Sequence, residues 1–220
     1  MTYKLAIFDL DGTILNTLED LADATNYALT QHGYPRRTTE EVRRFVGNGI
    51  RKLIERAVPA GTPEEEINRV HQTFSAYYQQ HCADKTRPYE GILQLLQQLR
   101  AAGCMTAVVS NKADIAVQPL CRHYYDGLFD YAVGEREGIR RKPAPDSVLE
   151  VLRRLQTDAS QAVYIGDSEV DIQTAANAGM DSIIVTWGFR DRAYLESQGG
   201  RRFADTPAEV YDLVRGMGKS

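Results

Sequence analysis

The chain has 220 residues, of which 43% are hydrophobic and 25% charged, and this length can bury a core of ordinary size, with or without an inserted domain. Its formal net charge of -4 at pH 7 argues against a general nucleic-acid-binding protein, because such proteins carry basic surfaces. No apolar run approaches the about 20 residues of a membrane span, and the three cysteines form no Cys-x-x-Cys pair that would indicate a zinc site.

The first predicted element is a short strand that ends in two carboxylates. Residues 5–8 (Leu-Ala-Ile-Phe) are typical of a buried strand, and Asp9, Asp11 and Gly12 follow directly. Because side chains alternate along a strand, Asp9 and Asp11 are expected on the same side, and Gly12 allows a sharp turn. Two carboxylates this close are unfavourable unless a cation offsets their charge, so the pair indicates a divalent metal site.

Residues 16–82 show helical patterns and no convincing strand. Apolar residues recur at helical spacing, and turn residues such as Gly33 and Gly47 interrupt the pattern. Helices are predicted at about residues 18–29, 40–46, 50–57 and 67–78. We therefore expect a block of about four helices inserted between the first strand and the rest of the chain.

From Gly91 onward, strands and helices alternate. Strands are predicted at residues 105–109, 129–133, 162–165 and 182–186. Helices are predicted at residues 92–102, 113–124, 145–155, 170–178 and 207–214, with a kink or break expected at Pro119. This alternation predicts an α/β protein with a mostly parallel sheet and helices on both faces.

Four polar clusters lie at or just after predicted strand ends, where open α/β sheets bind their ligands. They are Asp9 with Asp11, Ser110 with Asn111, Lys142 before Pro143, and Asp167 with Asp171. Each has an ordinary explanation when taken alone: Asp171 as a helix cap, Ser110 as an N-cap residue, Lys142 as a surface lysine. Their occurrence together, in this order, indicates an active site.

With these motifs the chain resembles the phosphatases of the haloacid dehalogenase (HAD) superfamily over essentially its whole length. The matching motifs are Asp9-Leu10-Asp11-Gly12-Thr13, the strand-end Ser110, Lys142-Pro143, and Gly166-Asp167 through Asp171. The resemblance implies a Rossmann-like parallel-sheet core of residues 1–15 and 83–220. It also implies an inserted four-helix cap domain of residues 16–82.

The resemblance further implies catalysis through an aspartyl-phosphate. Asp9 is the expected nucleophile, because a carboxylate is already ionised at neutral pH. Asp11 would protonate the leaving oxygen and then deprotonate the attacking water. Mg²⁺ is the expected cofactor, with Asp9, the backbone carbonyl of Asp11 and Asp167 as ligands and Asp171 in a supporting role.

The expected phosphate-binding residues follow from the same motifs. They are Gly12, Thr13, Ser110, Asn111 and Lys142. Phosphoryl transfer depends mainly on positioning and on neutralising the phosphoryl oxygens, which these groups could supply.

The predicted substrate comes from the cap. Residues 45–57 resemble the corresponding cap segment of phosphoglycolate phosphatases. Gly49 lies in a glycine-rich turn that frees backbone N–H groups at a helix start, and Arg51 adds positive charge; both suit a carboxylate. The alternative is a simple turn between helices with a solvated basic face. We expect a small acidic phosphate ester such as 2-phosphoglycolate.

Other functions remain open on sequence alone. A β-phosphoglucomutase-like mutase and a pyrophosphatase belong to the same superfamily, and a non-catalytic protein could bind phosphate and metal with the same groups. The cap segment disfavours the mutase, and the intact Asp9 and Asp11 pair disfavours the non-catalytic protein. We expect a cytoplasmic enzyme, because free cysteines are typical of reducing compartments, with a small-molecule substrate and neither nucleic acid nor membrane as a partner.

Overall fold

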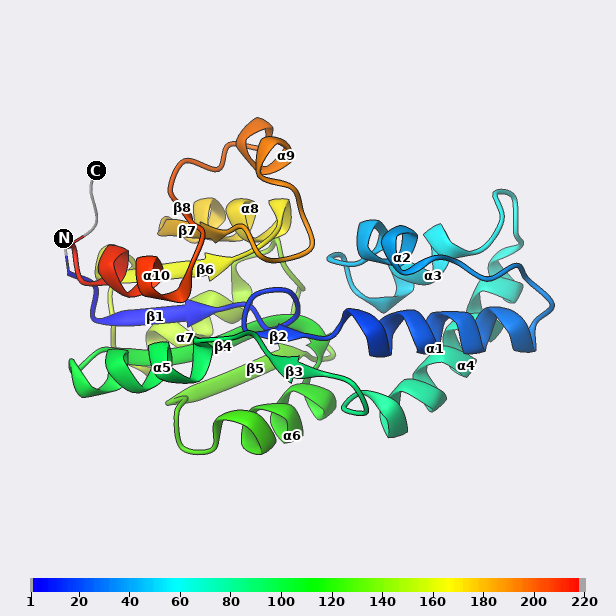
Figure 1. Cartoon of the computed structure of the whole chain (residues 1–220), viewed down its shortest axis with the longest axis horizontal. Helices are drawn as coiled ribbons and strands as arrows, with labels where there is room; N and C mark the ends of the chain where they lie inside the picture. Colours follow the sequence, from blue (N-terminus) through cyan, green and yellow to red (C-terminus); the bar gives the residue numbers. More distant parts are fainter. Residues whose placement is uncertain (1, 218–220) are drawn as a thin grey trace. The chain divides into compact units, whose positions relative to one another are not determined.

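The structure, a computed structural model, describes residues 2–217 and divides them into two compact units (Figure 1). One unit is formed by the described residues up to Leu15 and from Pro88 onward, and the other by Asn16–Arg87. Two short strands, β2 (Leu15–Asn16) and β3 (Arg87–Pro88), pair where the chain passes from one unit to the other and returns. The sequence analysis placed the end of the inserted segment at residue 82, whereas in the structure residues 83–87 also belong to the helical unit.

The first unit contains a six-stranded sheet in which every neighbouring pair is parallel. In spatial order its strands are β5 (Tyr131–Glu135), β4 (Met105–Ala113), β1 (Leu5–Phe8), β6 (Ala162–Gly166), β7 (Asp181–Val185) and β8 (Phe203–Ala204). β1 lies between β4 and β6, and all four of its residues are buried. A continuous apolar run is the pattern expected of a parallel strand that is covered on both faces.

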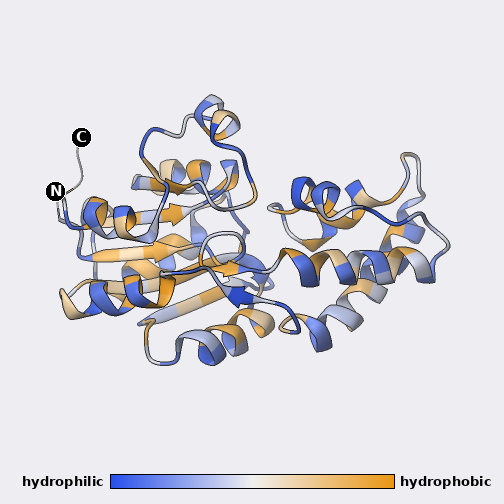
Figure 2. Ribbon diagram, viewed as in Figure 1, coloured by the Kyte–Doolittle hydropathy of each residue, from blue (hydrophilic) through white to orange (hydrophobic). Residues whose placement is uncertain are grey.

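Helices cover both faces of this sheet. They are α5 (Ile92–Ala101), α6 (Asp114–Tyr125), α7 (Asp146–Arg154), α8 (Glu169–Asn177), α9 (Arg192–Ser197) and α10 (Pro207–Val214). Ala6 and Phe8 of β1 join a core cluster with residues of α5, α6 and α10, whereas Leu5 and Ile7 join a second cluster with residues of α7 and α8. The alternation along one strand thus assigns the helices to opposite faces, and Figure 2 shows the apolar strands between amphipathic helices.

The second unit consists of four helices. They are α1 (Leu18–Gln31), α2 (Thr39–Phe45), α3 (Ile50–Ala57) and α4 (Glu64–His81). Apolar residues of these helices, among them Leu29, Leu53 and Phe74, are fully buried. The Rossmann-like parallel-sheet core and the inserted helical block that the sequence predicts are both confirmed.

The main differences from the predicted elements concern β4, α6 and several short elements. β4 continues to Ala113, whereas the apolar pattern predicted its end at residue 109. α6 continues through Pro119 without a break. The sequence analysis missed β2, β3, α9, β8 and a 3₁₀ helix at Ala159–Gln161, which are too short to show a periodic pattern. Within the described residues, no helix is both long and apolar enough to cross a membrane.

Candidate active site

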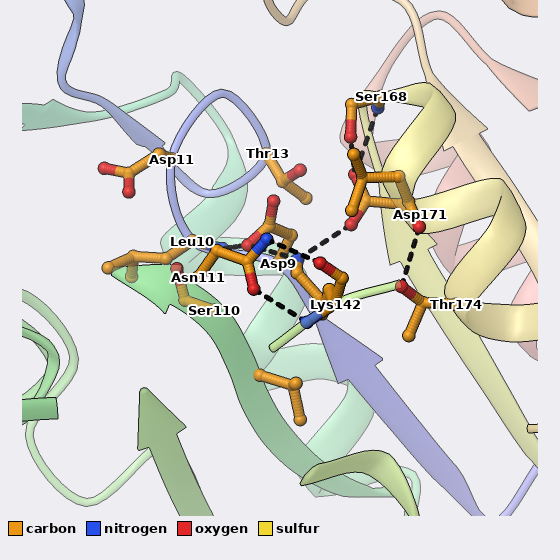
Figure 3. Close-up of polar contacts among 12 residues, drawn as sticks. Asp9, Leu10, Asp11, Thr13, Ser110, Asn111, Lys142, Ser168, Asp171 and Thr174 are labelled. Atoms are coloured by element: carbon orange, nitrogen blue, oxygen red, sulfur yellow. Dashed lines mark hydrogen bonds and ion pairs between the residues drawn. The ribbon is translucent and has the colours of Figure 1, made fainter. Parts of the chain in front are cut away.

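The candidate active site lies at the carboxyl ends of the three central strands. Phe8 at the end of β1 pairs with Val108 of β4 and Ile165 of β6. Because these parallel strands end at one edge, the residues that follow them converge there. Figure 3 shows this group of side chains, with Asp9 and Lys142 at its centre.

Lys142 is the charged centre of the group. Its buried Nζ atom lies 2.9 Å from Oδ1 of Asp9 and 2.8 Å from Oδ1 of Asp171, and it donates to the hydroxyl of Tyr164 at 3.0 Å. Asn111 fixes the backbone of Lys142: its Oδ1 accepts the Lys142 N–H at 2.8 Å and its Nδ2 donates to the Lys142 carbonyl at 3.1 Å. The lysine therefore reaches the end of β1 from a loop that Asn111 of β4 anchors.

Asp167 is held tightly at the end of β6. Its Oδ1 accepts a hydrogen bond from the Thr13 hydroxyl at 3.2 Å, and its Oδ2 accepts one from the backbone N–H of Phe189 at 2.7 Å. A Cβ atom on Gly12 would collide with the carboxylate, and one on Gly188 would collide with the Asp167 side chain. Gly12 also has a φ of +85°, so two separate constraints favour glycine there. The Asp167 side chain is thus enclosed by two glycines and oriented by two donors.

Asp171 is fully buried in the first turn of α8. Its Oδ2 accepts hydrogen bonds from the backbone N–H of Asp167 at 3.2 Å and from the N–H and hydroxyl of Ser168 at 3.0 and 2.6 Å. Its Oδ1 binds Lys142. Asp171 therefore caps α8, as predicted, and its other carboxylate oxygen contacts Lys142.

Burial changes the acidity of these carboxylates. Burial, with the neighbouring carboxylates Asp171 and Asp167, raises the pKa of Asp9 to about 8, although Lys142 opposes the shift. Burial and Asp171 likewise raise the pKa of Asp167 to about 7. For Lys142, burial alone would lower the pKa, but Asp171 and Asp9 hold it well above its ordinary value. The described carboxylates therefore crowd more negative charge together than Lys142 neutralises.

This carboxylate group suits a hard divalent cation. Oxygens of Asp9, Asp167 and Asp171 all lie within 4.8 Å of one another, and all three residues are buried. Carboxylate oxygens are ligands that Mg²⁺ takes in proteins, and a cation would stabilise the ionised forms that burial and the neighbouring carboxylates disfavour in Asp9 and Asp167. The residues present therefore fit a divalent metal ion.

Asp11 does not join this group through its side chain. β1 ends at Phe8, so the strand alternation that predicted Asp9 and Asp11 on one side does not extend to Asp11. Figure 3 shows the Asp11 carboxylate directed away from Asp9. It pairs instead with Lys112, whose Nζ lies 2.9 Å from its Oδ1. The expectation of a shared side was wrong because the backbone turns before Asp11.

The remaining predicted site residues of the core have defined contacts. The hydroxyl oxygen of Ser110 accepts the backbone N–H of Lys112 at 3.2 Å. The N–H of Gly12 donates to the Leu15 carbonyl at 2.9 Å, which closes the turn after β1. Thr13 donates to Asp167, as described above. These contacts hold Ser110, Gly12 and Thr13 in place around Asp9 and Asp167.

The two predicted cap residues lie in the helical unit. Gly49 is the N-cap of α3, with a φ of +81° that favours glycine. Arg51, in the first turn of α3, has its Nε 3.0 Å from Oε1 of Glu55, and its guanidinium also binds Glu64 and Asn68. Arg51 therefore links α3 to α4 in this structure.

Several residues of the site were missed by the sequence analysis. Lys112 and Tyr164 lie on strands, and the segment with Gly188 and Phe189 follows β7. Trp187 of the same segment was not missed, because the sequence already suggested either a place at the pocket entrance or a core role for it; in the structure it donates from Nε1 to the Thr13 carbonyl at 3.0 Å. The signal that could have identified this segment is its position, because it follows the strand beside β6 at the same edge of the sheet.

Comparison with known proteins places the chain in a family. Residues 6–185 match the model of the haloacid dehalogenase-like hydrolases. A phosphoglycolate phosphatase of Agrobacterium fabrum is 34% identical over 198 residues, which cover 87% of this chain and 84% of that protein. An N-acetylmuramic acid 6-phosphate phosphatase of Pseudomonas aeruginosa is 32% identical over 97% of this chain and 96% of that protein.

A solved structure agrees with these sequence matches. A crystal structure from Lactobacillus delbrueckii subsp. bulgaricus superposes with a TM-score of 0.95 at 42% identity, covering 98% of this chain and 100% of that one. The predicted superfamily and the predicted enzyme class, a phosphatase, are confirmed. The chain belongs to the family of haloacid dehalogenase-like hydrolases.

Proposed function

We propose that this protein hydrolyses small acidic phosphate esters, with Mg²⁺ as its cofactor and a covalent aspartyl-phosphate on Asp9 as the intermediate. The observation that carries this proposal is the setting of Asp9. Its carboxylate lies at the end of the central strand, 2.9 Å from Lys142 and within reach of the buried carboxylates of Asp167 and Asp171. A carboxylate with an ammonium group and a fitting metal site beside it is suited to attack on phosphorus.

The proposed reaction has two steps. In the first, an oxygen of Asp9 forms a bond to phosphorus while the bond to the leaving oxygen breaks, and Asp11 gives that oxygen a proton. In the second, Asp11 takes a proton from a water molecule whose oxygen attacks the same phosphorus, and the bond to Asp9 breaks. The sum is an alcohol and inorganic phosphate, with both side chains restored.

We assign the metal to Asp9 and Asp167, with the backbone carbonyl of Asp11 as a further ligand. Both oxygens of Asp171 already accept hydrogen bonds or bind Lys142, so Asp171 supports the site rather than leading it. When bound, Mg²⁺ would supply the positive charge that keeps Asp9 ionised and neutralises the phosphoryl oxygens.

The phosphoryl group is proposed to lie between Ser110 and Lys142. Ser110 contributes a hydroxyl from within β4, and Lys142 contributes an ammonium group beside Asp9. Both polar ends of the Asn111 amide are bound to the Lys142 backbone, so we assign Asn111 to the positioning of Lys142. Gly12 and Thr13, in the turn after β1, are proposed to contact the phosphate as well.

Two relatives support an acidic substrate. One is named for phosphoglycolate and the other for N-acetylmuramic acid 6-phosphate. Both compounds carry a carboxylate in addition to the phosphate ester, so the shared chemistry is a phosphate ester with a second negative group. We propose 2-phosphoglycolate as the substrate and Gly49 and Arg51 as candidate carboxylate contacts, with N-acetylmuramic acid 6-phosphate as the second candidate.

Phosphate release tests the proposal directly. The purified protein is assayed with and without Mg²⁺ on 2-phosphoglycolate, N-acetylmuramic acid 6-phosphate, glucose 6-phosphate and pyrophosphate, and on β-glucose 1-phosphate for mutase product. We expect Mg²⁺-dependent release that is fastest from 2-phosphoglycolate. Preference for the muramic acid ester would select the second candidate, and preference for pyrophosphate or mutase turnover would select an alternative enzyme. No turnover of any compound would favour a non-catalytic binding protein.

A further inference from the structure

A second buried lysine lies beside the active site, outside the motifs of the proposed mechanism. β4 continues past Val109, its last residue before a shift in register with β5, and reaches Ala113. The extension carries Lys112, whose side chain is only 3% exposed. Burying an ammonium group is costly, and in proteins such groups are paired with carboxylates. The position of Lys112 therefore requires a reason.

The two carboxylates after β1 each pair with a different lysine. Lys142 binds Asp9, together with Asp171, whereas Lys112 binds Asp11 at 2.9 Å. The nucleophile and the residue that transfers protons therefore have different lysines. The Asp11 side chain is 17% exposed, so water can compete for hydrogen bonds to its carboxylate. A fixed partner such as Lys112 is therefore needed to hold it in one orientation.

We propose that Lys112 is a positioning residue that holds the Asp11 carboxyl group in its orientation away from Asp9, on the side of the phosphoryl group where an in-line displacement places the leaving oxygen. The inference rests on the proposed function, because it assumes that Asp11 gives a proton to the leaving group. Lys112 itself gives no proton and forms no bond to the substrate. Its contribution is orientation, and a misplacement of about 1 Å in a reacting group can cost about 100-fold in rate.

Lys112 also has a second contact with the site. Its backbone N–H donates to the hydroxyl oxygen of Ser110 at 3.2 Å. This contact comes from the main chain, so it survives any substitution of the side chain. A side-chain variant of Lys112 therefore tests the link to Asp11 and leaves the support of Ser110 in place.

The test compares two substrates with different leaving groups. The leaving group of an alkyl ester such as 2-phosphoglycolate is a strongly basic alkoxide, which must be protonated as it departs. The leaving group of p-nitrophenyl phosphate is a stable phenolate, which departs with almost no help from an acid. Lys112→Met removes the ammonium group and keeps most of the length. We expect kcat/KM to fall by about 100-fold on 2-phosphoglycolate and by at least about tenfold less on p-nitrophenyl phosphate, because general acid catalysis contributes about 10²–10⁴-fold.

Three further variants complete the experiment. Lys112→Arg keeps the charge and is expected to recover part of the loss on 2-phosphoglycolate. Lys112→Gln is measured alongside, so that a result is still obtained if Lys112→Met folds poorly, which a low Tm would show. Lys4→Met, an exposed lysine at the opposite end of β1, is the matched control and is expected to leave both rates unchanged.

A double mutant separates positioning from general damage. If Lys112 acts through Asp11, then Lys112→Met in an Asp11→Asn background is expected to cost almost nothing more on 2-phosphoglycolate. Equal losses on both substrates, or full additivity with Asp11→Asn, would overturn the inference while leaving the phosphatase proposal intact. A wild-type protein that releases no phosphate from either substrate would overturn the proposed function and this inference with it.

Discussion

Asp9 is the proposed nucleophile, and Asp9→Asn tests this role. Burial raises the pKa of Asp9 to about 8, so the metal-free fold already tolerates an uncharged group there. We expect the variant to fold with a similar Tm and to lose at least about 10³-fold in kcat, as other enzymes do when their nucleophile is removed. Phosphate release and thermal unfolding measure the two effects. Turnover within tenfold of wild type would rule out Asp9 as the nucleophile.

Gly188, which belongs to none of the sequence motifs, leads to a prediction about metal binding. An added Cβ would collide with the Asp167 side chain, so Gly188→Ala is expected to displace that carboxylate and its contact with Phe189. Changes in the residues that orient metal ligands typically weaken binding by about 10–100-fold, and we expect a loss of this size for Mg²⁺ in a calorimetric titration without substrate.

The control for this substitution is Gly127→Ala in the same unit. Its Cβ meets open space, but its φ of +68° strains an alanine, so it is expected to lower Tm without changing Mg²⁺ affinity. Unchanged affinity in Gly188→Ala would show that Asp167 does not depend on the enclosure by glycine.

At the level of elements, the sequence predicted what has a repeating pattern. The four cap helices and the alternating strands and helices of the core show apolar periodicities in the sequence, and Asp9 and Asp167 directly follow strand ends as predicted. β4 was predicted too short because its apolar run ends at Val109, and the polar residues after it resemble a loop. Their burial comes from partners distant in sequence: Lys112 binds Asp11, and Asn111 binds Lys142. The residues next to them in the sequence show no pattern that would predict such distant pairs.

The helix α3 allows a test of the cap's proposed role in substrate selection. Arg51 binds Glu55, Glu64 and Asn68 in this structure, so it already has a structural function. If it also contacts the substrate carboxylate, Arg51→Ala is expected to raise KM severalfold for 2-phosphoglycolate and to leave KM for p-nitrophenyl phosphate unchanged.

The matched control is Arg69→Ala, because Arg69 pairs only along its own helix α4 in the contacts described, with Glu65 at 2.7 Å and Glu66 at 2.9 Å. Exposed pairs of this kind contribute about 0.3–0.5 kcal/mol, so a small change in Tm and no change in KM are expected. An equal rise in KM for both substrates in Arg51→Ala would indicate a structural role alone.

For the whole molecule, the buried carboxylates make stability depend on pH in an unusual direction. The pKa values of Asp9 and Asp167 are raised to about 8 and about 7, above their ordinary value of 3.8, so the folded protein binds more protons than the unfolded chain in this range. Their contribution to the free energy of unfolding is therefore present at low pH and is lost as the pH rises through about 4 to 8.

Mg²⁺ is expected to reverse this trend because it binds the ionised carboxylates. Added Mg²⁺ should raise Tm by more at about pH 8.5 than at about pH 6, and thermal unfolding at both values with and without the ion measures the difference. In Asp167→Asn the Mg²⁺ effect should shrink at both values. A rise in Tm that is the same at both pH values would contradict the proposed metal site.

The pairing of β2 with β3 has a consequence for how such a protein can change over generations. These two strands hold the ends of the inserted segment, Asn16 and Arg87, next to each other, and the N–H of Tyr89 donates to the Ile14 carbonyl beside them at 3.2 Å. A segment whose ends are neighbours can be lengthened, shortened or exchanged for another without rerouting the sheet. The proposed reacting groups all lie in the other unit, so the insert could acquire new specificities while the proposed chemistry is inherited unchanged.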